Sequence, residues 1–239
     1  MSVQWKVMYT LAQAVEVKVP VAGYIDLGIS LLYDSNNKLT HVEHQLATQD
    51  TATIDDVLTL SQEQLKLFWE VLHYQRGVPL TIGSRTVEQT QTVNESAPTR
   101  TSDISITVAA SFCKILDLPS RSLFLSPSGR LIVWLRLANE ATSATDVDAI
   151  RNYYMIWEDM RGRPTLNTAP LTANRLKFVR DFVSHGEALI NTALLAFIQR
   201  ELGAPVNQYD PTDKAHQELI RKHREQARQL IEGEISQHL

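Results

Sequence analysis

Two side chains with complementary acid–base and anion-binding chemistry, Arg180 and His185, lie within the sequence RLKFVRDFVSHGEAL, residues 175–189. Histidine has an ordinary pKa near 6.5, so it can take up or release a proton at neutral pH. Arginine stays protonated, and its planar guanidinium matches the oxygens of a phosphate. Together these residue types can transfer a proton and stabilise negative charge on a phosphate group.

Polar and basic residues around this pair extend the hypothesis. Asp181 could orient Arg180, and Ser184 could bind substrate or the helix backbone. Residues 160–180 contain no acidic side chain, although the chain as a whole has a formal charge of -4. A local excess of positive charge is typical of a surface that binds a phosphate backbone. We therefore predict that substrate phosphates are contacted by Arg163, Arg175 and Lys177.

The spacing of the pair restricts how it could work. In an ideal helix, Arg180 and His185 are rotated by about 140° from one another and do not share a face. Either two subunits build one composite cleft, or the helix breaks at Gly186, which has no Cβ. A non-catalytic alternative is that Arg180 and Asp181 form a surface ion pair while His185 caps the helix C-terminus.

The first half of the chain has the alternation of apolar and polar residues that predicts strands. Such segments run over 3–9 and 14–21, and a hairpin is expected to turn at residues 34–37. One helix is expected to begin at Ser61, with Gln64 completing a capping box, and to end at Gly77 and Pro79. Further strands are predicted at 79–83, 85–93 and 103–111, followed by a hairpin over 121–137 that turns at 126–129.

The composition becomes helical after residue 138. A helix is predicted from Thr145 as N-cap to Gly162, with a buried side formed by Ile150, Tyr153, Tyr154 and Trp157. Residues 171–203 have helical spacing on either side of Gly186, as two helices or as one with a weak point. A polar helix follows from Asp210. The sequence thus predicts an α+β chain with a β-rich domain over 1–138 and a helical bundle over 139–239.

Several classes of site and location are not supported by the sequence. It contains one cysteine, Cys113, which excludes a disulfide within the chain. No glycine-rich phosphate loop is present, and His41 and His44 are expected on opposite faces of a strand, where they could not share a metal ion. We expect no metal or cofactor. There is no signal-peptide pattern and no apolar run of membrane-spanning length, so a cytoplasmic protein without membrane association is expected.

The segment RDFVSHG resembles the signature of the HEPN superfamily, which is an arginine, a polar residue, three further positions and a histidine. Here Arg180, Asp181 and His185 match it, and the resemblance covers only the last hundred or so residues. It implies an all-α bundle, a homodimer, and a metal-independent endoribonuclease of bacterial defence or toxin systems, with RNA as substrate and a protein partner or antitoxin as regulator. Inactive HEPN domains imply two alternatives: a dimerisation or partner-binding module, and a nucleotide sensor with a pocket lined by Tyr153, Tyr154 or Trp157. The resemblance implies no role for the β-rich domain, which could recognise substrate, sense a trigger or hold a partner.

Overall fold

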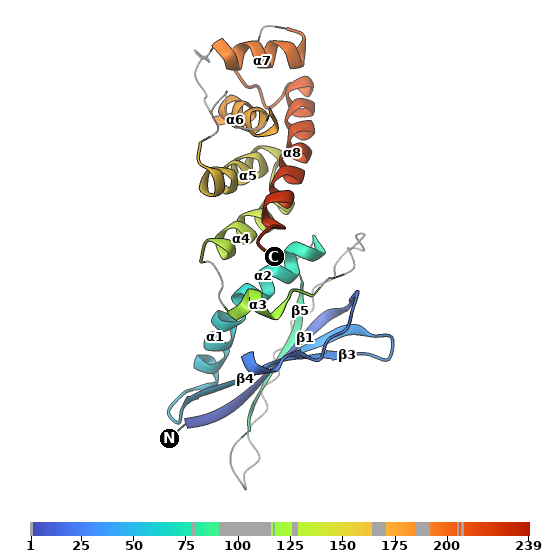
Figure 1. Ribbon diagram of the computed structural model, residues 1–239, viewed down its shortest axis with the longest axis vertical. Coiled ribbons are helices and arrows are strands. Elements are labelled where there is room, and N and C mark those ends of the chain that lie inside the picture. The colour runs from blue at the N-terminus through green and yellow to red at the C-terminus, as the bar shows by residue number, and fades with distance from the viewer. Residues whose placement is uncertain are drawn as a thin grey trace. The chain divides into compact units, whose positions relative to one another are not determined.

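The computed structural model describes residues 2–77, 80–90, 116, 118–125, 129–163, 171–184, 192–204, 206 and 208–239. The chain divides into two units, Met1–Ser128 and Gly129–Leu239. The first contains an antiparallel sheet and the second contains helices (Figure 1), so the predicted α+β class is confirmed. The division follows Ser128 instead of the expected Ala138, because residues 129–143 form a helix of the second unit.

Five strands form the sheet of the first unit, in the spatial order β2-β3-β4-β1-β5. All four neighbouring pairs are antiparallel. The strands are β1 (Ser2–Glu16), β2 (Gly23–Tyr24), β3 (Ile29–Tyr33), β4 (Lys38–Gln49) and β5 (Ile82–Gln89), with the short 3-10 helix η1 (Ile25–Leu27) after β2.

The two strands predicted at 3–9 and 14–21 are a single strand, β1. A shift in its pairing with β4 between Thr10 and Val15 lets the strand continue through the irregular stretch. The strand ends at Glu16, so the predicted continuation to Val21 is wrong. Pro20 has no N–H with which to extend a ladder, and Val19 is exposed.

The predicted hairpin at residues 34–37 is confirmed between β3 and β4. Asp34 Oδ1 accepts hydrogen bonds from the backbone N–H groups of Asn36 at 2.8 Å and Lys38 at 2.9 Å. Asn37 has a φ of 60°, in the left-handed region that asparagine tolerates. The turn chemistry was therefore readable from local residue types alone.

Two helices, α1 (Ile54–Gln64) and α2 (Lys66–Arg76), replace the single helix expected from Ser61. The helical region begins earlier, because Thr53 and Asp56 form a capping box. Ser61 is not an N-cap but a buried residue within α1. Gly77 ends α2 with a φ of 76°, as predicted.

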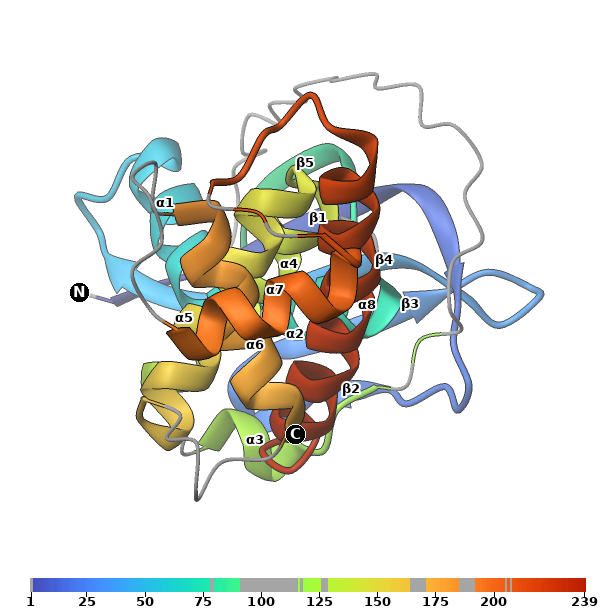
Figure 2. The same cartoon turned by 90° about the horizontal axis from the view of Figure 1, so that it is seen from above.

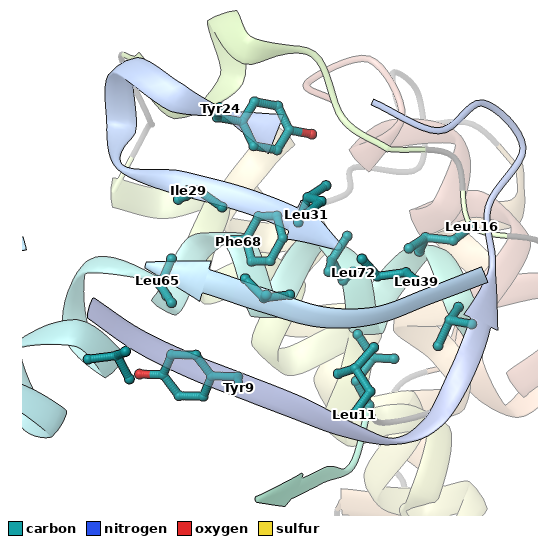
Figure 3. Packing of buried hydrophobic residues seen from close by; sticks show 14 of the residues in the cluster. Tyr9, Leu11, Tyr24, Ile29, Leu31, Leu39, Leu65, Phe68, Leu72 and Leu116 are labelled. Atoms are coloured by element: carbon teal, nitrogen blue, oxygen red, sulfur yellow. The ribbon is translucent and has the colours of Figure 1, made fainter. Parts of the chain in front are cut away.

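The core of the first unit lies between the sheet and these helices. Leu65, Phe68 and Leu72 pack against apolar side chains of the strands, including Tyr9, Ile29, Leu31 and Leu39 (Figure 3). This face accounts for the period-two burial along β1, where Val7, Tyr9 and Leu11 are buried.

The hairpin predicted over residues 121–137 is wrong, because the described residues of this segment lie in helices α3 (Arg121–Leu125) and α4 (Gly129–Ser143). The buried residues of α4 include Leu131, Trp134, Leu135 and Ala138, which have helical spacing. Of the other predicted strands, β5 covers the end of 79–83 and part of 85–93. The strand predicted at 103–111 lies outside the described residues, as does Cys113.

The second unit is a helical bundle in which the longest helix, α8, contacts each of the other four (Figure 1; Figure 2 shows it from the α7 end). Its helices are α4, α5 (Asp146–Arg161), α6 (Leu171–Ser184), α7 (Thr192–Leu202) and α8 (Lys214–Ile235). Thr145 caps α5 by accepting from the Asp148 N–H, and Gly162 ends it, as predicted. None of the helices in the described ranges combines the length and apolar character needed to cross a membrane.

Candidate functional site

Helix α6 carries most of the predicted site residues. It buries one apolar face, which includes Ala173, Leu176 and Val179, and it contacts α5 and α8. This spacing explains why the segment is helical and which side faces the bundle. Its remaining positions carry Arg175, Lys177, Arg180, Asp181 and Ser184.

Arg180 is held in a defined orientation near the end of α6. Its guanidinium carbon lies 4.1 Å from the ring centroid of Tyr154 in α5, a cation–π contact. Its Nη1 lies 3.0 Å from Asp181 Oδ1, and its side chain is 26% exposed. Its Nε is buried and has no hydrogen-bond partner within the described part of the chain. Arg180 is thus a fixed cation whose side chain is partly accessible, although its unpaired Nε is not.

Asp181 is in contact with Arg180, and its expected orienting role stays a prediction. Its side chain is only 17% exposed and lies directly against Arg180. Ser184, the last residue of α6, is exposed to solvent. The pairing of Arg180 with Asp181 occurs in both the catalytic and the non-catalytic hypotheses, so this contact does not choose between them.

The C-terminal turn of α6 is bound by a second arginine. Arg151 of α5 donates from Nη2 to the carbonyl oxygen of Val183 at 3.2 Å, and its Nη1 lies 3.1 Å from Asp148 Oδ1. Cations stabilise the C-terminal end of a helix, where carbonyl groups lack partners. Arg151 was not predicted as a site residue, because its contact with Val183 joins two helices far apart in sequence.

His185 lies outside the described residues, together with Gly186. Helix α6 ends at Ser184 and α7 begins at Thr192, so the two are separate helices. The structure therefore gives no distance for the Arg180–His185 pair, and its arrangement stays a prediction.

The three predicted phosphate contacts do not form one group. Arg163 follows α5, and its Nε donates to Glu158 Oε1 at 2.7 Å, although 82% of its side chain is exposed. Arg175 and Lys177 are half-buried in the first half of α6. Arg175 lines a cavity against α8, about 140° around the helix from Arg180.

The positive charge expected over residues 160–180 is partly compensated by acids from outside that stretch. Glu158 pairs with Arg163, and Glu234 of α8 accepts from Arg161 at 2.7 Å. The prediction from the sequence therefore overestimated the net positive charge around residues 160–180. Glu158 could have been considered from the sequence, but Glu234 is brought close only by folding.

The aromatic residues considered for a nucleotide pocket are part of the bundle core. Tyr153, Tyr154 and Trp157 are all buried in α5. Desolvation raises the pKa of the Tyr153 hydroxyl. Because the face of Tyr154 is already occupied by Arg180, these rings have no exposed face on which a base could stack.

Sequence reasoning did not find a buried polar cluster in the first unit. Ser61 Oγ lies 2.8 Å from His44 Nδ1 and accepts the Tyr9 hydroxyl at 2.7 Å. A serine beside a histidine is the arrangement of an activated nucleophile. Here, however, Tyr9 and Ser61 are 0% exposed and His44 is 2% exposed, so no substrate can reach them. Burial also lowers the pKa of His44 to about 4.

Two buried histidines of α8 were also missed. His216 Nδ1 accepts the backbone N–H of Asp210 at 3.0 Å, and its ring contacts Phe182. His223 lies 3.6 Å from Glu201 of α7, and burial lowers its pKa. Within the described ranges, no group of three or more histidine, cysteine or acidic side chains is placed to hold a metal ion.

Comparison with known proteins adds no relative. No family model, curated protein or solved structure matches the chain. The resemblance to the HEPN superfamily is thus carried by the segment around Arg180 alone.

Proposed function

We propose that the protein is a metal-independent endoribonuclease of HEPN type that acts as a homodimer in the cytoplasm. The observation that carries this proposal is the fixed position of Arg180 between the Tyr154 ring and Asp181. A cation that is already oriented stabilises developing charge without a reorganisation cost during the reaction. The resemblance of RDFVSHG to the HEPN signature assigns the partner of this cation as His185.

In the proposed reaction, the ribose 2′-oxygen attacks the adjacent phosphorus while His185 takes up the 2′-hydroxyl proton. The bond between phosphorus and the 5′-oxygen breaks, and that oxygen receives a proton from an imidazolium. The products are a 2′,3′-cyclic phosphate and a free 5′-hydroxyl. Arg180 stabilises the additional negative charge on the phosphoryl oxygens. A dimer supplies one histidine as base and the other as acid.

Lys177 is the proposed phosphate contact nearest to Arg180 on α6, since it lies about 60° from it around the helix. Arg163 contributes through its exposed guanidinium while it remains paired with Glu158. Activity of this kind suits a bacterial defence or toxin system, in which a protein partner or antitoxin restrains the enzyme.

The second candidate function is a non-catalytic dimerisation or partner-binding module. The same contacts also favour this function. Tyr154 covers one face of the Arg180 guanidinium, Asp181 compensates its charge, and its Nε is buried. In this function Arg180 joins α5 to α6 and never contacts RNA.

The deciding experiment is cleavage of a labelled pool of total RNA in EDTA by the wild type, His185→Ala and Arg180→Ala. Arg221→Ala is the matched control, because Arg221 is an exposed arginine of α8. The ribonuclease requires cutting by the wild type and the control, with loss in both site variants while folding and dimerisation are retained. If neither the wild type nor the control cuts any RNA, the partner-binding module is the better description.

If Arg180→Ala does not fold, Arg180→Lys provides the test, because it keeps the charge and loses the planar fork. Cleavage that persists at the wild-type rate in both His185→Ala and Arg180→Lys would exclude the proposed pair.

A further inference from the structure

A cavity of about 390 Å³ lies between the first half of α6 and α8. Its lining consists of Thr172, Arg175, Gln226, Gln229 and Leu230. The volume falls within the range of small-molecule sites. Among the described residues that line it, one is a cation, three are neutral and polar, one is apolar, and none is acidic. This composition favours a polar ligand with negative charge.

Two of the lining residues contain buried polar atoms without a partner. Arg175 Nε and Gln226 Oε1 are inaccessible to solvent and form no hydrogen bond within the described part of the chain. Folded proteins pair nearly all such atoms, because an unpaired buried donor or acceptor is costly. Arg175 Nε is a donor and suits an anionic oxygen, whereas Gln226 Oε1 is an acceptor and would pair only with a hydroxyl or N–H of the ligand's organic part.

The charge around Arg175 is not cancelled by its acidic neighbour. Glu201 of α7 is engaged by Lys222, whose Nζ lies 2.8 Å from Glu201 Oε2. This hydrogen bond lowers the pKa of Glu201, and the charge of Arg175 adds to the effect. Burial lowers the pKa of His223, again with a contribution from Arg175, so His223 is neutral at pH 7. Arg175 and Lys222 together therefore outweigh Glu201.

An acid that is bonded to the lining residue Gln229 is also engaged. Glu225 accepts from Arg228 Nη2 at 2.5 Å and from Gln229 Nε2 at 3.0 Å. These contacts compensate its charge and use one of the two amide N–H groups of Gln229. The donors left for a ligand are the Arg175 guanidinium, the Thr172 hydroxyl, the Gln226 amide and the second N–H of Gln229.

We propose that this cavity binds the phosphate group of a phosphate monoester. Arg175 would pair with the phosphate, since its fork matches two phosphate oxygens. The hydroxyl of Thr172 and the amide of Gln226 supply donors from other directions, which suits a tetrahedral anion. The remaining volume accommodates the organic part of the ester. The site does not depend on the proposed ribonuclease, because it is on another side of α6 from Arg180.

The same chemistry can come from a free metabolite or from the phosphorylated end of an RNA. Calorimetric titrations of the full chain in EDTA would compare inorganic phosphate, ribose 5-phosphate and a 2′-O-methyl oligonucleotide with or without a 5′-phosphate. The modified oligonucleotide has no free 2′-hydroxyl, so the proposed cleavage cannot consume it. Saturable binding of the sugar phosphate alone identifies a metabolite site, and preference for the 5′-phosphorylated oligonucleotide identifies an RNA end.

Arg175→Gln is expected to raise the Kd of the preferred probe about tenfold or more. Gln226→Leu should weaken it less, and the matched control Arg221→Gln should leave it unchanged, because Arg221 is exposed on α8 and does not line the cavity. The proposal is overturned if the wild type binds none of the probes saturably, or if Arg175→Gln binds as tightly as the wild type. If Arg175→Gln does not fold, Arg175→Lys and Gln226→Leu decide by the same criterion.

Discussion

Two clusters of polar residues, one in each unit, contain side chains of types used in catalysis. The clusters differ in how exposed to solvent their side chains are and in how many of their polar atoms form hydrogen bonds. In the first unit, Tyr9, Ser61 and His44 are sealed from solvent and bond to one another. In the second, the side chain of Arg180 is 26% exposed, although its unpaired Nε is buried. Residue types with catalytic chemistry thus make a site only where a substrate can reach them.

The largest expected effect is a difference in RNA cleavage between a variant of the Arg180 cluster and a variant of the Ser61 cluster. Arg180→Ala should reduce RNA cleavage by about 10²- to 10³-fold, the usual loss when a group that stabilises developing charge is removed. Ser61→Ala should cleave at the wild-type rate, because Ser61 is inaccessible. Initial rates at equal concentrations of folded protein check this. Loss of cleavage in Ser61→Ala without loss of stability would contradict the contrast.

The next effect concerns stability. Ser61→Ala should lower the free energy of unfolding by about 1–3 kcal/mol, because it leaves the Tyr9 hydroxyl and His44 Nδ1 without their shared partner. Urea denaturation followed by tryptophan fluorescence measures it. Thr59→Ala is a suitable control, since Thr59 bonds only the preceding turn of α1 at a solvent-exposed position. A Ser61 variant as stable as the wild type would show that the cluster contributes little.

A pH dependence should follow from His44. Its folded pKa is about 4 against an ordinary value of 6.5, so the unfolded chain binds more protons between these values. The stability contribution is present above pH 6.5 and is lost as the pH falls towards 4, with a slope of at most about 1.4 kcal/mol per pH unit. His73 and His223 shift in the same direction, so the comparison is with His44→Asn. Equal slopes for both proteins would contradict the assignment.

The smallest effect tests how Arg180 is held. Tyr154→Leu removes the ring beneath the guanidinium and should cost about 1 kcal/mol of cation–π stabilisation in addition to the loss of packing. Tyr154→Phe keeps the ring and should retain cleavage. Thermal unfolding and cleavage rates of both variants provide the measurement. If Tyr154→Leu cleaves as fast as Tyr154→Phe, the ring does not orient Arg180 for catalysis.

Features encoded by neighbouring residues were predictable from the sequence. The cap at Thr145, the stop at Gly162 and the turn before Asn37 depend on a few adjacent positions, and all are present. The segment LIVWLRL was misread because its apolar residues fit a strand as well as a helix. Only packing in the bundle decides between them.

The candidate site was predictable only in part. The closeness of Arg180 and Asp181 follows from adjacency in the sequence. Their support by Tyr154, the contact of Arg151 with Val183, and the pairing of Arg161 with Glu234 join separate helices. No local pattern encodes such contacts, which is why the positive charge of residues 160–180 was overestimated.

The position of α8 in the chain has a consequence during protein synthesis. Helices α4, α5, α6 and α7 all contact α8, and Arg224 of α8 donates to the Ala141 carbonyl at 2.9 Å. These four helices leave the ribosome before their common partner, so the bundle can close only after α8 has emerged. The Arg180 end of α6 is therefore assembled only after α8 has been synthesised, and a nascent chain that stops before Lys214 would carry the RDFVSHG segment without the helix that completes its fold.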